Sequence, residues 1–208
     1  MGRISSAPTI EAHPAWELAH DVSPQGELSE EGYLALTTNH LVEYSHGQLE
    51  VLSMPRMSHQ QIALMLVQML LRFVESRKLG TVLFAPLRVQ LWPGKFREPD
   101  IIFMRREHAN RMSEAFWDGA DLVVEVVSPD DRRRDLETKR REYAQAAIPE
   151  YWIVDPELQR ITVLTLAGAE YFVHGEFGAG EQATSALLPG FVVDVAAVFA
   201  AADRSAAA

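Results

Sequence analysis

Two acidic residues stand where they could share a divalent cation. Asp100 follows Pro99 and precedes a short apolar run at residues 101–104, whereas Glu125 interrupts the apolar run at residues 122–127. A carboxylate inside a buried strand is costly unless a metal, a cation or several donors pair with it. If the two runs are neighbouring strands, these carboxylates converge at one end of a sheet, where together with a backbone carbonyl they would suit Mg²⁺. Such a cation activates water and stabilises charge on a phosphate.

Lys139 is the third residue that could take part in this chemistry. We expect a charged helix at residues 131–147, on which Leu136, Lys139 and Tyr143 share one face because of their spacing. Leu136 and Tyr143 should pack on the sheet, so the Lys139 ammonium should point inward as well. Asp135 stands four residues before Lys139 and could form an ion pair with it.

The elements that would position these groups follow an α/β pattern. Residues 58–78 carry a wide apolar stripe at helical spacing, which predicts a long helix. The remaining core elements are expected to be strands near residues 81–91, 100–104, 122–127 and 151–154, with the charged helix before the last of them. The order is helix, strand, strand, strand, helix, strand, which predicts an α/β domain with a mixed β-sheet flanked by helices on both faces.

A β-hairpin is expected before this core. Residues 41–44 and 49–52 are strand-like and flank a turn that contains Gly47. The hairpin carries Glu43 and Glu50, and we expect only one of these two acids to face the site because side chains alternate along a strand.

The whole chain is expected to form one domain with loose ends. We place an N-terminal arm at residues 1–28, the domain at residues 29–201 and a frayed tail at residues 202–208. Apolar segments at residues 161–166 and 191–198 lie outside the core order. Together with the arm they favour a homodimer, which is the common closed form of soluble oligomers.

The composition excludes several classes of site. The 208 residues carry a formal net charge of −10, which argues against coating of nucleic acid by bulk electrostatics but allows a local basic groove. There are no cysteines, so disulfides, thiolate zinc sites and cysteine nucleophiles are excluded, and a cytoplasmic location is expected. No apolar stretch is long enough to span a membrane.

An ordered set of residues along the chain resembles a known nuclease superfamily. The set comprises Glu43 and Gly47 in the hairpin, His59 at a helix start, Pro99 with Asp100, Glu125 with Val126, Ser128 with Pro129, Asp135, Lys139, Tyr143 and the run at residues 151–156. It resembles the PD-(D/E)xK nucleases, and more closely the Uma2 family (DUF820-type) of restriction-endonuclease-like bacterial proteins. Val127 stands where the superfamily has a lysine, so the second half of the signature matches only in part.

The resemblance implies both a fold and a site. It implies a restriction-endonuclease-like core, DNA as the substrate, and Mg²⁺ or Mn²⁺ bound by Asp100, Glu125 and the Val126 carbonyl. It also implies that Lys139 on the helix replaces the lysine missing from the strand. The supporting residues would be Glu43, Glu50, His59 and Asp135.

Three functions are compatible with these residues. The first is a Mg²⁺-dependent endonuclease that hydrolyses phosphodiester bonds. The second is a catalytically inactive dimer of the same fold that binds nucleic acid or protein, in which Glu125 and Lys139 form a structural ion pair. The third is metal-dependent hydrolysis of another substrate. The presence of Asp100, Glu125 and Lys139 together favours the first.

Other charged residues have simpler interpretations. The run at residues 132–134 is more often a solvated helix face than a DNA contact, although Arg132, Arg133 and Arg140 are placed to reach phosphate. His59 is explained more readily as a residue at a helix N-terminus than as a metal ligand.

Overall fold

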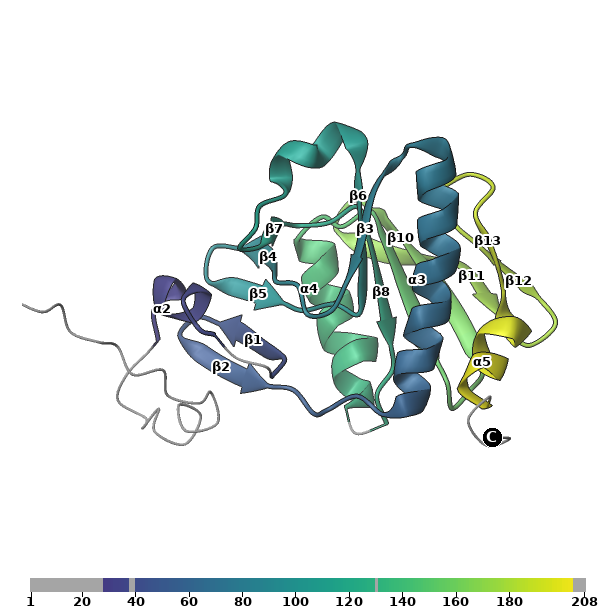
Figure 1. Ribbon diagram of the computed structural model, residues 1–208, viewed down its shortest axis with the longest axis horizontal. Coiled ribbons are helices and arrows are strands. Elements are labelled where there is room, and N and C mark those ends of the chain that lie inside the picture. The colour runs from purple at the N-terminus through teal and green to yellow at the C-terminus, as the bar shows by residue number, and fades with distance from the viewer. Residues whose placement is uncertain (1–27, 38–39, 130, 204–208) are drawn as a thin grey trace, which may run out of the picture.

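The computed structural model describes residues 28–37, 40–129 and 131–203 and is built on a central sheet (Figure 1). The sheet has six strands, in the order β11 (Glu170–Phe177), β10 (Arg160–Ala167), β9 (Glu150–Asp155), β8 (Leu122–Val126), β6 (Ile101–Arg105) and β3 (Gly80–Phe84). Strands β8 and β9 are parallel, and the other neighbouring pairs are antiparallel. The sheet is therefore mixed, as expected.

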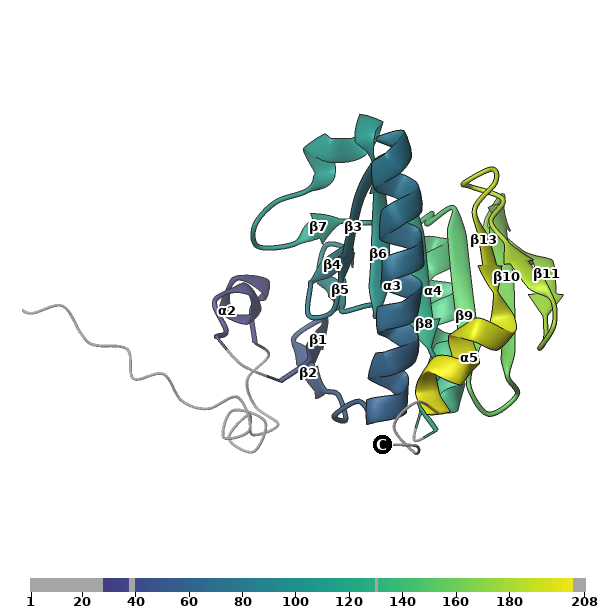
Figure 2. The ribbon, with the colours of Figure 1, turned by 45° about the vertical axis from the view of Figure 1, so that its right-hand side comes forward.

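Helices cover both faces of this sheet (Figures 1 and 2). One face carries α3 (Met57–Arg77) and α5 (Val195–Asp203), and the other carries the π-helical segment η2 (Arg134–Thr138) followed by α4 (Lys139–Gln145). Ile101 and Phe103 belong to the core under α3, whereas Ile102 and Met104 belong to the core under α4. This alternation follows from the geometry of a strand, in which neighbouring side chains point to opposite faces.

A second sheet of five strands carries the N-terminal hairpin (Figure 1). Its order is β2 (Gln48–Val51), β1 (Val42–Ser45), β5 (Lys95–Arg97), β4 (Val89–Trp92) and β7 (Trp117–Asp118). Next to it, α2 (Glu30–Leu34) begins after Ser29, whose hydroxyl accepts a hydrogen bond from the Gly32 N–H at 3.0 Å. Tyr33 of α2 packs with Tyr44 and Phe96 of the sheet. The remaining elements are η1 (Arg106–Arg111), β12 (Gln182–Thr184) and β13 (Val192–Asp194).

The predicted order of core elements is confirmed as α3, β3, β6, β8, α4 and β9. The strand expected near residues 81–91 is two separate strands, β3 and β4, which belong to different sheets. Pro86 lies between them and has no N–H to donate to a ladder, which accounts for the interruption. The helix α3 begins at Met57, one residue earlier than expected.

The apolar segments at residues 161–166 and 191–198 lie largely inside the domain. Ile161 and Val163 of β10 are buried, and so are Phe191 and Val198, all in the core under α3. These segments therefore do not form an exposed interface, and the argument for a homodimer that rested on them is wrong.

The expected arm and tail fall mostly outside the described residues. Leu28 belongs to the folded part, since its N–H donates to the Gly47 carbonyl at 3.1 Å and its carbonyl accepts from Tyr44 OH at 2.7 Å. At the other end α5 continues to Asp203. Within the described ranges, no helix is long and apolar enough to cross a membrane.

Candidate active site

Asp100 and Glu125 lie next to each other at one end of the central sheet. β6 and β8 pair antiparallel with Ile101 opposite Val124, and the same register continued by one residue places Asp100 opposite Glu125. Directly opposed residues of an antiparallel pair have their side chains on the same face. The Val126 N–H donates to Asp100 Oδ2 at 2.7 Å. The two predicted strands are thus neighbours, and the acids converge as expected.

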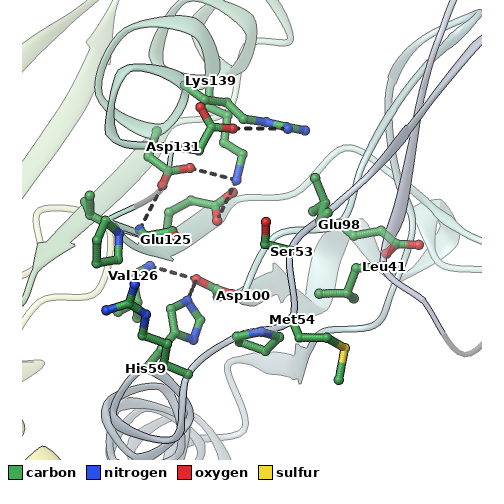
Figure 3. A pocket seen from close by; sticks show the side chains of 18 of the residues that line it. Leu41, Ser53, Met54, His59, Glu98, Asp100, Glu125, Val126, Asp131 and Lys139 are labelled. Atoms are coloured by element: carbon green, nitrogen blue, oxygen red, sulfur yellow. Dashed lines mark hydrogen bonds and ion pairs between the residues drawn. The ribbon is translucent and has the colours of Figure 1, made fainter.

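The two acids line a pocket of about 270 Å³. Further walls come from the second strand of the hairpin, from the segment that links β2 to α3, and from the turn and helix after β8. Figure 3 shows the side chains of Asp100, Glu125 and Lys139 directed toward the same space. The fold therefore brings the three principal candidates of the sequence together.

Lys139 reaches the pocket from the helix that covers the sheet. Its Nζ lies 3.0 Å from Glu125 Oε2 and 3.0 Å from Asp135 Oδ1. The Tyr143 hydroxyl donates to the other Glu125 oxygen, Oε1, at 2.5 Å. The predicted inward direction of Lys139 and its pairing with Asp135 are confirmed. Leu136, expected on the same face, is partly buried and packs against the core that contains Tyr143, as predicted.

A π-helical turn lies just before Lys139. The Lys139 N–H bonds to the Arg134 carbonyl, five residues back, instead of following the α-helical pattern. The wider turn of a π-helix shifts which side chains share a face. As a result Arg134, Asp135 and Lys139 are buried and line the pocket together.

The charges of the pocket shift the pKa values of its residues. Burial raises the pKa of Glu125 to about 7; Lys139 opposes this shift, and the charges of Asp100 and Asp135 add to it. Burial alone would lower the pKa of Lys139, but Glu125 and Asp135 outweigh it and raise that pKa. Lys139 is therefore a permanent cation, whereas the charge of Glu125 depends on its surroundings.

His59 also belongs to the site. It lies in the first turn of α3, and its Nε2 is 3.1 Å from Asp100 Oδ2. Burial on its own would lower the pKa of His59, but the hydrogen bond and charge of Asp100 raise it. His59 thus lies at a helix N-terminus, as expected, and its ring also contacts Asp100.

The donor atoms fit a hard divalent cation. Two carboxylates, Asp100 and Glu125, lie beside the Val126 backbone, and oxygen ligands with several retained waters are what Mg²⁺ prefers. Both contacts of Asp100 described above use Oδ2, which leaves Oδ1 for a cation. Among the described residues, no group of three or more His, Cys, Asp or Glu side chains is arranged to hold a metal. The cation would thus depend on these two acids and a carbonyl.

Glu43 and Glu50 form a second charged cluster with Arg97 and Arg134. The hairpin register places the two acids directly opposite each other, and both pair with both arginines. Only Glu50 lines the pocket, as expected for one of the two, but Glu43 shares its face of the hairpin. Alternation along one strand does not separate them, because they stand on different strands.

The arginines suggested as contacts for nucleic acid lie elsewhere. Their partners are Asp155 and Glu157 for Arg132, Glu137 for Arg133, and the Tyr171 carbonyl for Arg140. None of these three arginines is among the described residues that line the pocket. The interpretation of residues 132–134 as a solvated face is wrong for Arg134, which is buried.

Sequence reasoning missed three residues of the site: Arg134, Glu98 and the Tyr143 hydroxyl. Glu98 lines the pocket and accepts a hydrogen bond from the Val42 N–H at 3.1 Å. Burial raises the pKa of Glu98 to about 7. Its position two residues before Asp100 was a usable signal, because residues i and i+2 of an extended chain point to the same side.

Comparisons with known proteins agree with this geometry. The family model Uma2, described as "Putative restriction endonuclease", matches residues 30–196. A crystal structure of a "putative nuclease belonging to DUF820" from Anabaena variabilis ATCC 29413 aligns with a TM-score of 0.68 and 17% identity, over 83% of this chain and 97% of that chain. At this identity the likeness shows a shared fold, which confirms the predicted fold class. The comparison with curated proteins finds no match.

Proposed function

The chain belongs to the Uma2 family, and from this membership and the pocket we propose that it is a metal-dependent nuclease that hydrolyses phosphodiester bonds of DNA. One observation carries the proposal. Asp100 and Glu125 face each other across neighbouring strands at a pocket, with the Lys139 ammonium 3.0 Å from Glu125.

The acids and the lysine take different parts in this reaction. Asp100, Glu125 and the Val126 carbonyl would hold Mg²⁺ or Mn²⁺. The bound cation supplies Lewis acidity that activates water and offsets negative charge on a phosphate. Lys139 keeps its proton because Glu125 and Asp135 raise its pKa. It therefore stabilises charge on the phosphate in the transition state and does not serve as a general base.

The first experiment is a Mg²⁺ and Mn²⁺ titration of DNA cleavage by the wild type and by Glu125→Gln. The substitution removes one negative ligand with little change of shape, so metal affinity and cleavage should fall together. Raised Mg²⁺ should recover part of the activity. Calorimetry of metal binding without DNA provides a second readout. Cleavage by Glu125→Gln that equals the wild type at limiting Mg²⁺ would contradict the proposal.

One observation favours a non-catalytic alternative. Both oxygens of Glu125 already have protein partners, Lys139 and Tyr143, so the cluster is also a satisfied structural ion pair. In that case the fold would serve as a binding module for nucleic acid or protein. Calorimetry that detects no Mg²⁺ or Mn²⁺ binding to the wild type would support this alternative.

A further inference from the structure

Arg134 is a buried cation at the edge of the pocket. It is 9% exposed, lines the pocket, and stands one π-helical turn before Lys139. Its Nε has no hydrogen-bond partner among the described residues, although the atom is buried. Buried polar groups are nearly always paired, so an unpaired donor beside a pocket calls for an explanation.

The partners of the Arg134 guanidinium are of two kinds. Glu43 lies behind it and is fully buried, whereas Glu50 and Asp131 are half-exposed, with side chains 51% accessible, and line the pocket. Burial alone would raise the pKa of Glu43, but Lys139, Arg97 and Arg134 lower it to about 2. Glu43 is therefore a fixed anion, while the other two acids can exchange Arg134 for another partner at little cost.

We propose that Arg134 binds a phosphate group of the substrate, held in place by Glu43 and released to the phosphate by Glu50 and Asp131. A guanidinium presents several donors in a planar fork that matches a phosphate. Arg134 and Lys139 line the same pocket, so a phosphate bound by Arg134 would lie near the Lys139 ammonium. The inference rests on the proposed function only in taking the phosphate to belong to a nucleic acid.

The other arginines near this helix do not fit the same role. Arg133 is 86% exposed and pairs with Glu137, and it does not border the pocket in the described chain. Arg97 contacts Glu43 as Arg134 does, but it is likewise absent from the described pocket lining. Arg134 combines burial, an unpaired donor and a place on the pocket wall.

A purely structural role for Arg134 makes the opposite prediction for its acidic partners. If Arg134 only links the hairpin to the helix through ion pairs, loss of Glu50 or Asp131 weakens that link and does not raise the affinity for phosphate. If Arg134 receives a phosphate, the two acids compete with it, and their removal strengthens phosphate binding. The sign of the change therefore separates the two roles.

The experiment measures binding of a short, fluorescein-labelled single-stranded DNA by anisotropy, with EDTA present so that neither metal nor cleavage contributes. Glu50→Gln and Asp131→Asn should each bind at least about threefold more tightly than the wild type, because a competitor for the guanidinium is gone. Arg134→Gln should bind about tenfold more weakly, since a charge-assisted contact is lost. The affinity of Arg134→Lys should lie between those of the wild type and Arg134→Gln, because lysine keeps the positive charge but lacks the planar set of donors.

Glu137→Gln is the matched control. It likewise removes one negative charge, but Glu137 lies in η2 and pairs with Arg133 away from the described pocket lining. The proposal is overturned if Glu50→Gln binds no more tightly than Glu137→Gln, or if the gain from Glu50→Gln persists in full when it is combined with Arg134→Gln. Absence of measurable DNA binding by both the wild type and Glu50→Gln overturns it as well. Glu50→Gln alone decides the matter should Arg134→Gln fail to fold, and a separate cleavage assay with Mg²⁺ tests the nuclease function independently.

Discussion

Glu125 sits in a pocket where its charge depends on a nearby cation. Burial raises its pKa to about 7 even though the Lys139 ammonium lies 3.0 Å away. A carboxylate in this position has two ways to remain charged, which are to keep its lysine or to gain a metal. The balance between these two partners is the difference between a structural ion pair and a catalytic site.

Replacement of Lys139 by methionine should make the fold dependent on a divalent cation. The change leaves Glu125 and Asp135 without their ammonium, and breaking a buried ion pair costs about 3–5 kcal/mol. Mg²⁺ bound by Glu125 would replace that charge, so melting curves should show a lower Tm that Mg²⁺ largely restores. Turnover should nevertheless drop about 100-fold or more, because the transition state loses a cationic partner.

Lys95→Met is the control for this prediction. Lys95 is also a buried lysine in an ion pair, 2.8 Å from Glu142, but it is not among the described residues that line the pocket. Its loss should lower Tm in a way that Mg²⁺ does not repair. If Mg²⁺ changes the Tm of neither Lys139→Met nor the wild type, the cluster of Asp100, Glu125 and Lys139 has a structural role.

Sequence patterns could place Asp100, Glu125 and Lys139 but not Arg134. The two acids are found from apolar runs that become neighbouring strands, and Lys139 from its spacing with Tyr143. Arg134 belongs to a run of three arginines, and a helical pattern alone does not tell which of them is buried. That choice is made by a π-helical turn and by two acids on a hairpin more than 80 residues away.

At the scale of elements, an ion cluster fastens the hairpin to the helix that carries Lys139. Glu43 of β1 pairs with Arg97 of β5 and with Arg134 of η2. In turn Arg97 reaches α4, where its Nε lies 2.7 Å from Glu142. The wall of the pocket and Lys139 are thus positioned by one charged network.

This cluster should make the fold sensitive to acid through Glu43. Its folded-state pKa of about 2 lies below the ordinary value of 4.5, so the charged form stabilises the fold at neutral pH. The contribution is present above about pH 4.5 and is lost as the pH falls toward 2; a shift of this size corresponds to roughly 3 kcal/mol. Urea denaturation between pH 7 and pH 2 measures it.

A comparison with Glu43→Gln isolates the effect. The gap in unfolding free energy between wild type and Glu43→Gln should narrow as the pH falls, because the wild-type acid becomes neutral. The corresponding gap for Glu31→Gln, an exposed residue of α2, should be small at every pH. A gap for Glu43→Gln that stays constant down to pH 2 would be inconsistent with a charged Glu43 in the folded cluster.

The long elements were predictable and the second sheet was not. α3 and the unit from β8 to β9 have strong periodicity or apolar runs, so local sequence identifies them. β4, β5 and β7 are short, of two to four residues each, and only β5 pairs directly with the hairpin, through β1, about 50 residues away in the sequence. Partners of that kind are chosen by tertiary packing, which local patterns do not contain.

At the scale of the whole molecule, the edges of the central sheet are where a second copy would join. β3 and β11 are its outer strands, and Phe84 and Phe172 on them are exposed. Edge strands with apolar side chains tend to pair with another chain. We therefore still expect a homodimer, and light scattering should give twice the monomer mass at micromolar concentration. Phe84→Lys and Phe172→Lys should show which edge is used, and a wild type of monomer mass throughout would contradict the expectation.

The overall charge predicts how nucleic acid binding responds to salt. The chain has a formal net charge of −10, and the described pocket lining holds three Lys or Arg residues against six Asp or Glu residues. Binding through Arg134 and Lys139 would neutralise about two phosphates, so a plot of log K against log salt should have a slope of about −1 to −2. Anisotropy titrations with single-stranded DNA in EDTA at several KCl concentrations measure this slope. A slope near about −6 would mean that a basic surface outside the pocket carries the binding, and Arg134→Gln would then leave the slope almost unchanged.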